Sequence, residues 1–331
     1  MIRKYLSIVL LAMGLATFAQ NQGEPDTEFE CLANAHQEVQ TYNKKKWKNL
    51  KAPVNLFIGS DLGRVGYYEQ KPIAKLMGEM AEVVGPDAVL ALGDTHHYMG
   101  VQSIYDPLWE SNYESIYMHP ELQVPWNAIC GNHEYRGNTQ AVADYSKVSR
   151  RWDMPAKYFT KTYTGKDAAV KVIFLDTTPI IDKYRNNPSE YPDAALQDVE
   201  AQLAWLDNEL ANATEDWVIV AGHHPVYADT PKDDSERSDM QAKVGLILDR
   251  HKPTMYICGH IHNFQHISKD GIDYIVNSSG SQSRPDVHKV DGTVFVSGKP
   301  GFSVISADKN QLRLSMIDNE GKIIHQITKT K

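Results

Sequence analysis

Five stretches of this sequence place a carboxylate, an amide or an imidazole directly after a short apolar run. Each run is typical of a buried strand, because it is largely apolar and ends at a polar residue. Gly93-Asp94 follows Ala88 to Leu92, and Gly131-Asn132 follows the run that ends at Cys130. Ligands of open α/β sheets bind outside the carboxyl ends of the strands. The five strand-end residues are Asp61, Asp94, Asn132, His223 and His260.

The side chains around these strand ends are oxygen and imidazole donors, and no thiolate is among them. Such donors suit zinc, iron or manganese. Asp94, with His96 and His97 close behind it, is placed to bridge two ions. Two ions lower the pKa of bound water and clamp the oxygens of an in-line displacement, as in phosphoryl transfer to water. The predicted ligands of this dinuclear site are Asp61, Asp94, His97, Asn132, His223, His260 and His262.

Strands alternate with helices from Val54 onward, and short strands dominate after Cys258. This order predicts an α/β fold with mixed sheets covered by helices, in one domain over residues 54–331. The amphipathic stretch from Asp193 to Leu210 carries Leu196 on its apolar face. Helices are expected over Pro72 to Val84, Gln102 to Tyr117, Thr139 to Trp152, Asp193 to Leu210 and Asp239 to Leu248.

The first 19 residues read as a signal peptide. Two basic residues precede an apolar segment from Leu6 to Leu15, and Thr17-Phe18-Ala19 fits a cleavage site. The apolar segment is too short to span a bilayer. We therefore expect an exported protein, periplasmic or secreted, without a membrane anchor. Residues 20–53 would form an N-terminal extension with an accessory helix.

Composition narrows the class of protein further. With 331 residues, of which 42% are hydrophobic, the chain can bury a sizeable core. Its formal charge of -8 argues against a nucleic-acid partner, which would require a basic face. We expect a monomer. The cysteines are Cys31, Cys130 and Cys258; the last two are expected as buried, inert thiols, and a bridge between them stays open.

The order of the motifs resembles that of the calcineurin-like metallophosphoesterases, and within them the small purple, or tartrate-resistant, acid phosphatases. The motifs are Asp-x-Gly, Gly-Asp, Gly-Asn-His-Asp/Glu, Gly-His and Gly-His-x-His. The resemblance implies a four-layer α/β/β/α sandwich of two mixed β-sheets flanked by helices. It also implies hydrolysis of small phosphate monoesters by in-line attack of a metal-bound hydroxide. Further matching segments are Gly100-Val101-Gln102, Val124-Pro125-Trp126, Tyr145-Ser146-Lys147, Gln202 to Leu206 and Gly259 to Asn263.

The resemblance also implies roles for single residues. His133 would contact the phosphate and protonate the leaving group, and Glu134 would orient a histidine from behind the ligands. His224 stands where the mammalian members have Tyr; it would touch phosphate or be a solvent-exposed imidazole. One ion would be held by Asp61, Asp94, His97 and His262, and the other by Asp94, Asn132, His223 and His260.

Position 97 departs from the family pattern. The purple colour of the family comes from a Tyr, three residues after the bridging Asp, bound to ferric iron. Here that position is His97, and Tyr98 is one residue out of phase. A neutral imidazole in place of a tyrosinate removes a negative charge and favours divalent ions. We therefore expect two divalent ions (Fe, Zn or Mn) and no ferric-tyrosinate centre.

Two questions stay open at the level of the sequence. The segment from Lys183 to Pro192 lies where the mammalian enzymes have a loop over the site, although a plain surface loop is the alternative. Two alternative interpretations of the sequence also stay open: a periplasmic phosphodiesterase or nucleotidase, and a metal- or phosphate-binding module without turnover. A metalloprotease is disfavoured, because the chain has no His-Glu-x-x-His motif.

Overall fold

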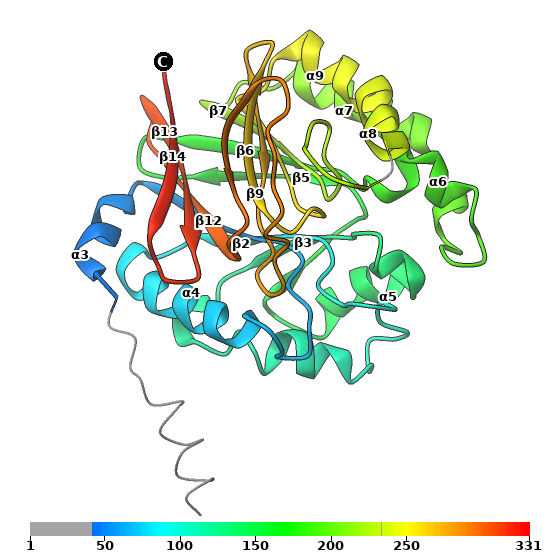
Figure 1. The fold of residues 1–331 in the computed structure, drawn as a ribbon, viewed down its shortest axis with the longest axis horizontal. Helices are drawn as coiled ribbons and strands as arrows, with labels where there is room; N and C mark the ends of the chain where they lie inside the picture. Colours follow the sequence, from blue (N-terminus) through cyan, green and yellow to red (C-terminus); the bar gives the residue numbers. More distant parts are fainter. Residues whose placement is uncertain (1–41, 233) are drawn as a thin grey trace, which may run out of the picture. The chain divides into compact units, whose positions relative to one another are not determined.

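Two β-sheets of seven strands each form the middle of the fold (Figure 1). The computed structural model describes residues 42–232 and 234–331. The first sheet has, in spatial order, β14 (Ile323–Thr330), β13 (Gln311–Asp318), β12 (Gly301–Ala307), β1 (Val54–Gly59), β2 (Ala88–Leu92), β3 (Trp126–Ile129) and β4 (Trp152–Asp153). The second has β11 (Thr293–Ser297), β9 (Phe264–Lys269), β10 (Ile272–Val276), β8 (Met255–Cys258), β7 (Trp217–Ala221), β6 (Ala169–Phe174) and β5 (Phe159–Thr164).

Helices cover the outer face of each sheet. In Figure 1, α4 and α5 lie below the sheets, and α7 and α9 lie above them. Both sheets mix parallel and antiparallel pairs, so the predicted four-layer α/β/β/α sandwich is confirmed. The helices are α3 (Lys44–Trp47), α4 (Gln70–Val84), α5 (Thr139–Asp144), α6 (Asp182–Arg185), α7 (Val199–Ala211), α8 (Asp234–Met240) and α9 (Leu246–His251).

The parallel strands bring the predicted site residues to one place. β1 pairs with β2 and β2 with β3, all parallel, so their carboxyl ends share one edge of the first sheet. In the second sheet β7 and β8 are parallel neighbours in the same way. A bridge between Ser60 and Ser279 joins the two edges just beyond β1 and β10. Every residue of β1, β2 and β3 is buried, as expected for strands covered on both faces.

Three predicted helices are wrong in extent, and each has a local cause. The segment 102–117 is mostly turn with a short π-helix (Glu110–Glu114), because the Asp106 carboxylate accepts the N–H groups of Gln102 and Leu108. The helix predicted from Thr139 to Trp152 ends at Asp144, since Trp152 joins β4 and packs its indole on Trp109. The helix predicted from Asp193 begins only at Val199, because Asp198 caps α7 by accepting the N–H of Ala201. Leu196 is therefore left exposed.

The helix predicted from Asp239 to Leu248 is longer than expected. It runs as α8 and α9 with a π-helical turn (Gln241–Gly245) between them. The strands β4, β5, β9 and β11 were not predicted. Short 3₁₀ turns complete the chain at Lys48–Leu50, Pro120–Leu122, Glu134–Arg136, Tyr145–Lys147, Thr178–Ile180 and Ala194–Leu196.

The predicted signal peptide, Cys31 and most of the predicted accessory helix lie outside the described residues. The part of the extension that is described packs on the domain: Trp47 is buried, and its indole N–H donates to the carbonyl of Gly321. Cys130 and Cys258 are buried free thiols, so the open alternative of a bridge between them is not realised. Among the described helices, none has the length and apolarity needed to cross a membrane.

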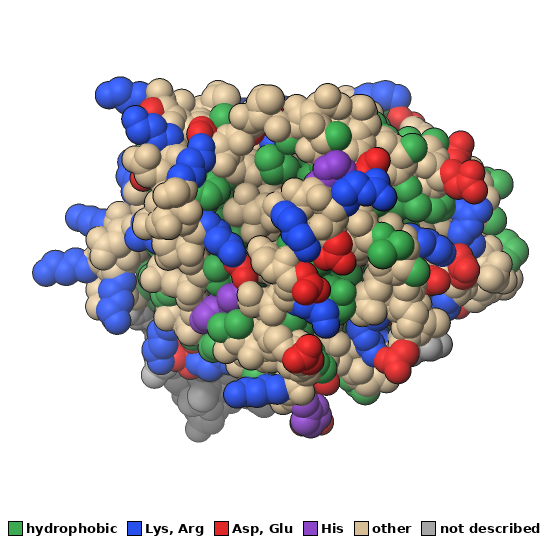
Figure 2. Space-filling model, turned by 90° about the horizontal axis from the view of Figure 1, so that it is seen from above, with side chains coloured by type: hydrophobic (Ala, Val, Ile, Leu, Met, Phe, Trp, Pro, Cys, Tyr) green, Lys and Arg blue, Asp and Glu red, His purple; other side chains and the backbone are tan. Residues whose placement is uncertain are grey.

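The charged residues of the surface are mixed in sign. Figure 2 shows Lys and Arg side chains interspersed with Asp and Glu across the face it views. This mixed face offers no broad basic stripe of the kind that tracks a phosphate backbone.

Asp176 makes stability depend on pH. Its carboxylate is buried two residues past β6, where it accepts a hydrogen bond from the Tyr135 hydroxyl, and burial raises its pKa from 3.8 to about 7. Between these two values the folded state binds the proton more tightly than the unfolded state. The free energy of unfolding therefore falls as pH rises from about 4 to about 7, by up to roughly 4 kcal/mol from this group.

The substitution Asp176→Asn removes this titration. We expect urea unfolding to show a flatter dependence on pH between 4 and 7 in the variant than in the wild type, with the gain in stability largest near pH 7.5. The exposed Asp291→Asn variant is the control, and its profile should match that of the wild type. Equal slopes for Asp176→Asn and the wild type would contradict the assignment.

Candidate metal centre

The predicted ligands form two clusters at the meeting edges of the sheets. In one, donor atoms of Asp61, His97 and His262 lie within 4.8 Å of one another; in the other, those of Asp61, Asp94 and His223 do. His262 Nε2 lies 3.0 Å from Asp61 Oδ1, and His223 Nε2 lies 3.2 Å from Asp94 Oδ2. Asp94 reaches both groups, because His97 Nε2 lies 3.4 Å from the same Oδ2. Asp94 therefore lies between the two groups of donor atoms, and its role as a bridging ligand stays a prediction.

Backbone carbonyls fix which nitrogen of each histidine faces the cluster. His97 Nδ1 lies 3.0 Å from Gly63 O, His262 Nδ1 2.6 Å from Gln282 O, and His223 Nδ1 2.8 Å from Leu92 O. A carbonyl only accepts, so each Nδ1 carries the proton and donates it. Each Nε2 is then left as a lone-pair donor toward the cluster, which is the usual arrangement behind a metal-bound histidine.

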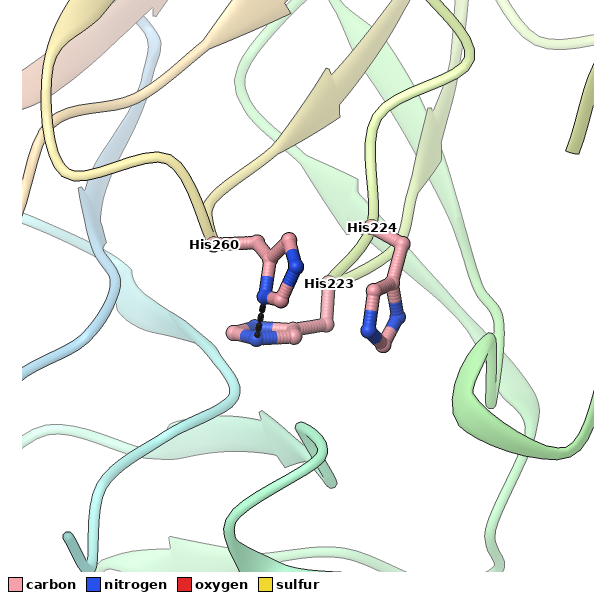
Figure 3. Close-up of side chains that lie close together, drawn as sticks. All are labelled: His223, His224 and His260. Carbon is pink, nitrogen blue, oxygen red and sulfur yellow. Dashed lines mark hydrogen bonds between the residues drawn. The ribbon is translucent and has the colours of Figure 1, made fainter. Parts of the chain in front are cut away.

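His260 uses its other ring nitrogen. Figure 3 shows its ring beside that of His223, with His260 Nδ1 3.2 Å from His223 Nε2. Its Nε2 points away and lies 2.9 Å from Glu236 Oε2 and 2.8 Å from Lys232 Nζ. The two histidines, from the ends of β7 and β8, therefore aim one nitrogen each at a common point.

Asn132 is the remaining predicted ligand. The residues on either side of it lie against the Asp94 carboxylate: the His133 N–H donates to Asp94 Oδ1, and a Cβ on Gly131 would come within 2.2 Å of that oxygen. Only glycine fits at position 131. Asn132 Oδ1 is buried and has no hydrogen-bond partner among the described residues. A buried acceptor without a partner is costly, so this oxygen, in a set of carboxylate and imidazole donors, fits a metal ion.

The backbone at the site is strained. Asp61, Asp94, His260 and His262 all have φ between 51° and 71°, in the left-handed region. Such residues cost on the order of 1 kcal/mol or more each and persist where the surroundings determine them, commonly at functional sites. Strain at four of the seven predicted ligands marks this edge as the functional part of the fold.

The charges of the site favour a cation. Although burial opposes ionisation, His223 and His133 hold the pKa of Asp94 well below its usual range. Burial would lower the pKa of His223, but Asp94 raises it to about 9. Two buried carboxylates thus draw positive charge to the histidine nitrogens, and a metal ion would displace the proton there.

Glu134 supports the bridging loop rather than a predicted ligand histidine. It is buried and accepts the N–H groups of Asp94 (2.8 Å), Gly131 (2.7 Å) and His96 (2.9 Å). His96 Nδ1 lies 3.7 Å from Glu134 Oε1, beyond hydrogen-bond distance. The carboxylate therefore shapes the turn that presents Asp94.

His133 lies at the open side of the centre. Its Nδ1 lies 2.7 Å from Tyr98 O and 3.2 Å from Arg136 Nη1, and its Nε2 lies 3.9 Å from Asp94 Oδ2. Burial lowers the pKa of His133 to about 4, so the imidazole is neutral unless a negative charge is brought beside it.

His224 is fully buried, so the alternative of a solvent-exposed imidazole is wrong. Both ring nitrogens are engaged, Nδ1 with Thr177 Oγ1 at 2.8 Å and Nε2 with Tyr184 OH at 3.1 Å. Figure 3 places its ring next to those of His223 and His260. Its contact with phosphate stays a prediction.

The loop from Lys183 to Pro192 meets the site at more than one place. At one end its Tyr184 hydroxyl lies 3.1 Å from His224 Nε2. Arg136, near His133, pairs with Glu190 at 2.9 Å and donates to the Tyr191 hydroxyl at 3.1 Å. Tyr191 is buried, so this end of the loop is anchored. Whether the loop restrains activity stays a prediction.

Several supporting residues were not predicted from the sequence. The Thr177 hydroxyl accepts the N–H groups of His223 and His224, and Lys232 Nζ donates to His260 O at 2.9 Å. Burial lowers the pKa of Lys232 to about 8. Glu236 and Lys232 lie in a charged segment without periodicity, so no local signal marks them.

Comparisons with known proteins agree with this geometry. The calcineurin-like phosphoesterase family matches residues 56–264. Human tartrate-resistant acid phosphatase type 5 is 30% identical over 267 residues, which cover 75% of this chain and 81% of that one. The rabbit protein of the same name is 33% identical over 218 residues, or 64% and 66% of the two chains. Arabidopsis thaliana purple acid phosphatase 3 is 28% identical, over 84% and 78%.

The chain belongs to the calcineurin-like phosphoesterases, as a purple-acid-phosphatase-like dimetal phosphoesterase. Solved structures share the fold at lower identity. GAP50, described as the anchor in the inner membrane complex of Plasmodium, has a TM-score of 0.72 at 22% identity, covering 84% of this chain and 88% of that one. The purple acid phosphatase PPD1 of yellow lupin has a TM-score of 0.57 at 16% identity, over 84% and 53%.

Proposed function

We propose that this protein is an exported phosphatase that hydrolyses small phosphate monoesters at a centre of two divalent metal ions, in the manner of an acid phosphatase. The observation that carries the proposal is the position of Asp94 between two groups of ligand atoms, with His133 at the open side. Export is supported by the first 19 residues of the sequence.

Each ion has its own set of residues in this proposal. Asp61, His97 and His262 would hold the first, and Asn132, His223 and His260 the second, with Asp94 shared. When bound, the two ions supply a water of lowered pKa and neutralise the phosphate oxygens. The neutral imidazole at His97 supports divalent iron, zinc or manganese there.

His133 binds the phosphate and transfers the proton in this proposal. His133 Nδ1 is held by Tyr98 O, which leaves Nε2 facing the open side near Asp94. A phosphate dianion beside this ring favours the imidazolium form. His133 can then bind a phosphate oxygen through Nε2–H and deliver that proton to the departing alkoxide.

The proposal is tested by comparing the rates on a monoester and a diester, 4-nitrophenyl phosphate and bis(4-nitrophenyl) phosphate, in buffers containing Mn²⁺, Zn²⁺ or Fe²⁺. We expect the monoester to have the higher kcat/KM. A faster diester would favour the phosphodiesterase rival. The fold likeness to GAP50, which is described as an anchor, makes a non-catalytic role the other rival, and no turnover with any metal would favour it.

The role of His133 predicts a leaving-group effect. His133→Asn should lower kcat by about 10² or more on an alkyl phosphate such as glycerol 2-phosphate, because general acid catalysis contributes about 10²- to 10⁴-fold. The loss should be smaller on 4-nitrophenyl phosphate, whose leaving group needs no proton. The exposed His288→Asn is the control. Equal losses on both substrates would mean that His133 binds phosphate without donating the proton.

A further inference from the structure

A pocket of about 600 Å³ opens beside the candidate metal centre. We name it the Arg64 pocket. His97 belongs both to this pocket and to the first ligand cluster, so the pocket adjoins the place where phosphate would be bound. Its lining residues are Arg64, Val65, Tyr67, Tyr68, His97 and Tyr98.

Arg64 brings an unpaired positive charge into this pocket. The residue is only 8% exposed, and its Nε and Nη1 are buried without a hydrogen-bond partner in the described part of the chain. No carboxylate within the described residues forms an ion pair with it; its guanidinium stacks over the Tyr98 ring at 4.7 Å. Burying a guanidinium without a carboxylate partner is costly, and an anion in the pocket would supply the missing opposite charge.

Aromatic faces surround this charge. Tyr67, Tyr68 and Tyr98 are large apolar side chains that are more than half exposed, at 72%, 58% and 58%. Exposed aromatic side chains gathered around a pocket mark a binding surface, and their faces can stack on a flat ring.

The loop that carries these groups is held in a strained form. Val65 and Tyr68 have φ of 55° and 54°, and positive φ at a β-branched residue is an outlier. The buried Gln70 side chain accepts the N–H groups of Arg64 and Gly66, and the Asn112 side chain accepts that of Val65. Strain held in place by buried hydrogen bonds is typical of a preorganised ligand site.

We propose that the Arg64 pocket binds the leaving group of the substrate and selects phosphate esters and anhydrides whose leaving group carries an aromatic ring and a second anionic group. The ring stacks on the tyrosines, and the anion pairs with Arg64. Nucleoside diphosphates and acidic aryl phosphates share this chemistry. The inference rests on the proposed phosphatase function and names the substrate class of the same site.

The test uses five substrates that separate the two features. Glycerol 2-phosphate has neither feature, phenyl phosphate has the ring, and 3-phosphoglycerate has the anion. Both 4-carboxyphenyl phosphate and ADP have ring and anion, and they distinguish an aryl acid from a nucleotide. For each substrate, kcat/KM of a variant is divided by that of the wild type, which removes differences in leaving-group reactivity.

We expect Arg64→Gln to lower kcat/KM by about 10- to 100-fold on 4-carboxyphenyl phosphate, on ADP or on both, the range expected when a hydrogen bond to a charged group is lost. Glycerol 2-phosphate and phenyl phosphate should change by less than about 3-fold, because they bring no second anion to the guanidinium. Arg64→Lys should recover only part of the loss, since an ammonium lacks the planar fork. Tyr98→Leu should weaken the three ring substrates and spare the other two. The exposed Arg150→Gln is the control for charge.

A binding measurement separates this inference from the proposed function. By isothermal titration calorimetry, AMP and 4-hydroxybenzoate, the leaving groups of the two doubly featured substrates, should bind the wild type more tightly than Arg64→Gln. An equal loss on all five substrates would make Arg64 a clamp for the transferred phosphate and overturn the inference, as would no loss on any. If no substrate is hydrolysed, the proposed function fails, and equal binding of both ligands by wild type and variant would then overturn the inference as well.

Discussion

Replacing Asp94 by Asn is expected to abolish most of the phosphatase activity and to empty the metal centre. Losing a residue behind a metal ligand typically costs roughly 10- to 100-fold, and Asp94 touches both clusters directly, so we expect a loss beyond about 100-fold. Its Oδ2 lies 3.2 Å from His223 Nε2 and 3.4 Å from His97 Nε2. An amide has one oxygen and no charge, so it cannot replace a bridging carboxylate.

The measurement is metal content together with kcat on 4-nitrophenyl phosphate. The exposed Asp291→Asn is the matched control and should keep both at the level of the wild type. The far-UV circular dichroism of Asp94→Asn should match that of the wild type, since Glu134 still holds the turn through the Asp94 N–H. A folded Asp94→Asn protein with two metal ions and full activity would contradict the bridging role.

Changing His97 to Tyr is expected to give the protein a purple colour, which we expect the wild type not to have. His97 is buried, points Nε2 toward Asp94, and belongs to the cluster with Asp61 and His262. A phenolate at this place adds a negative charge and favours ferric iron. Aerobically purified wild type should have no strong iron–tyrosinate band, and His97→Tyr loaded with iron should show one.

Tyr98 provides the control for this experiment. It is 58% exposed and lines the Arg64 pocket, so Tyr98→Phe should leave the spectrum unchanged. A purple wild type that loses its colour on Tyr98→Phe would assign the ligand to Tyr98 and contradict our account of position 97.

The central strands could be predicted from the sequence because burial on both faces and parallel topology act together there. β2 has the predicted bounds, Ala88 to Leu92, since central parallel strands are covered on both faces and are encoded as unbroken apolar runs. The unpredicted β4, β5 and β11 are edge strands. β11 has no buried residue, so it lacks the apolar content that marks a central strand.

The rest of the site comes from contacts distant in sequence. Glu236 meets His260 from α8, Thr177 holds His223 from the other side of β7, and Arg64 owes its burial to a loop pinned by Gln70 and Asn112. Thr177 follows the strand β6, but Glu236 and Arg64 follow no apolar run, and none of the three belongs to a recognisable motif. Tertiary packing determines where these side chains lie, and no local sequence pattern encodes that packing.

The most direct test of the central claim is a titration of metal-free protein with Mn²⁺, Zn²⁺ or Fe²⁺ while bound metal and phosphomonoester hydrolysis are measured together. The account predicts that activity appears only as the second ion binds and reaches its plateau at two ions per chain. Full activity with one ion per chain, or with none, would contradict a dinuclear centre bridged by Asp94.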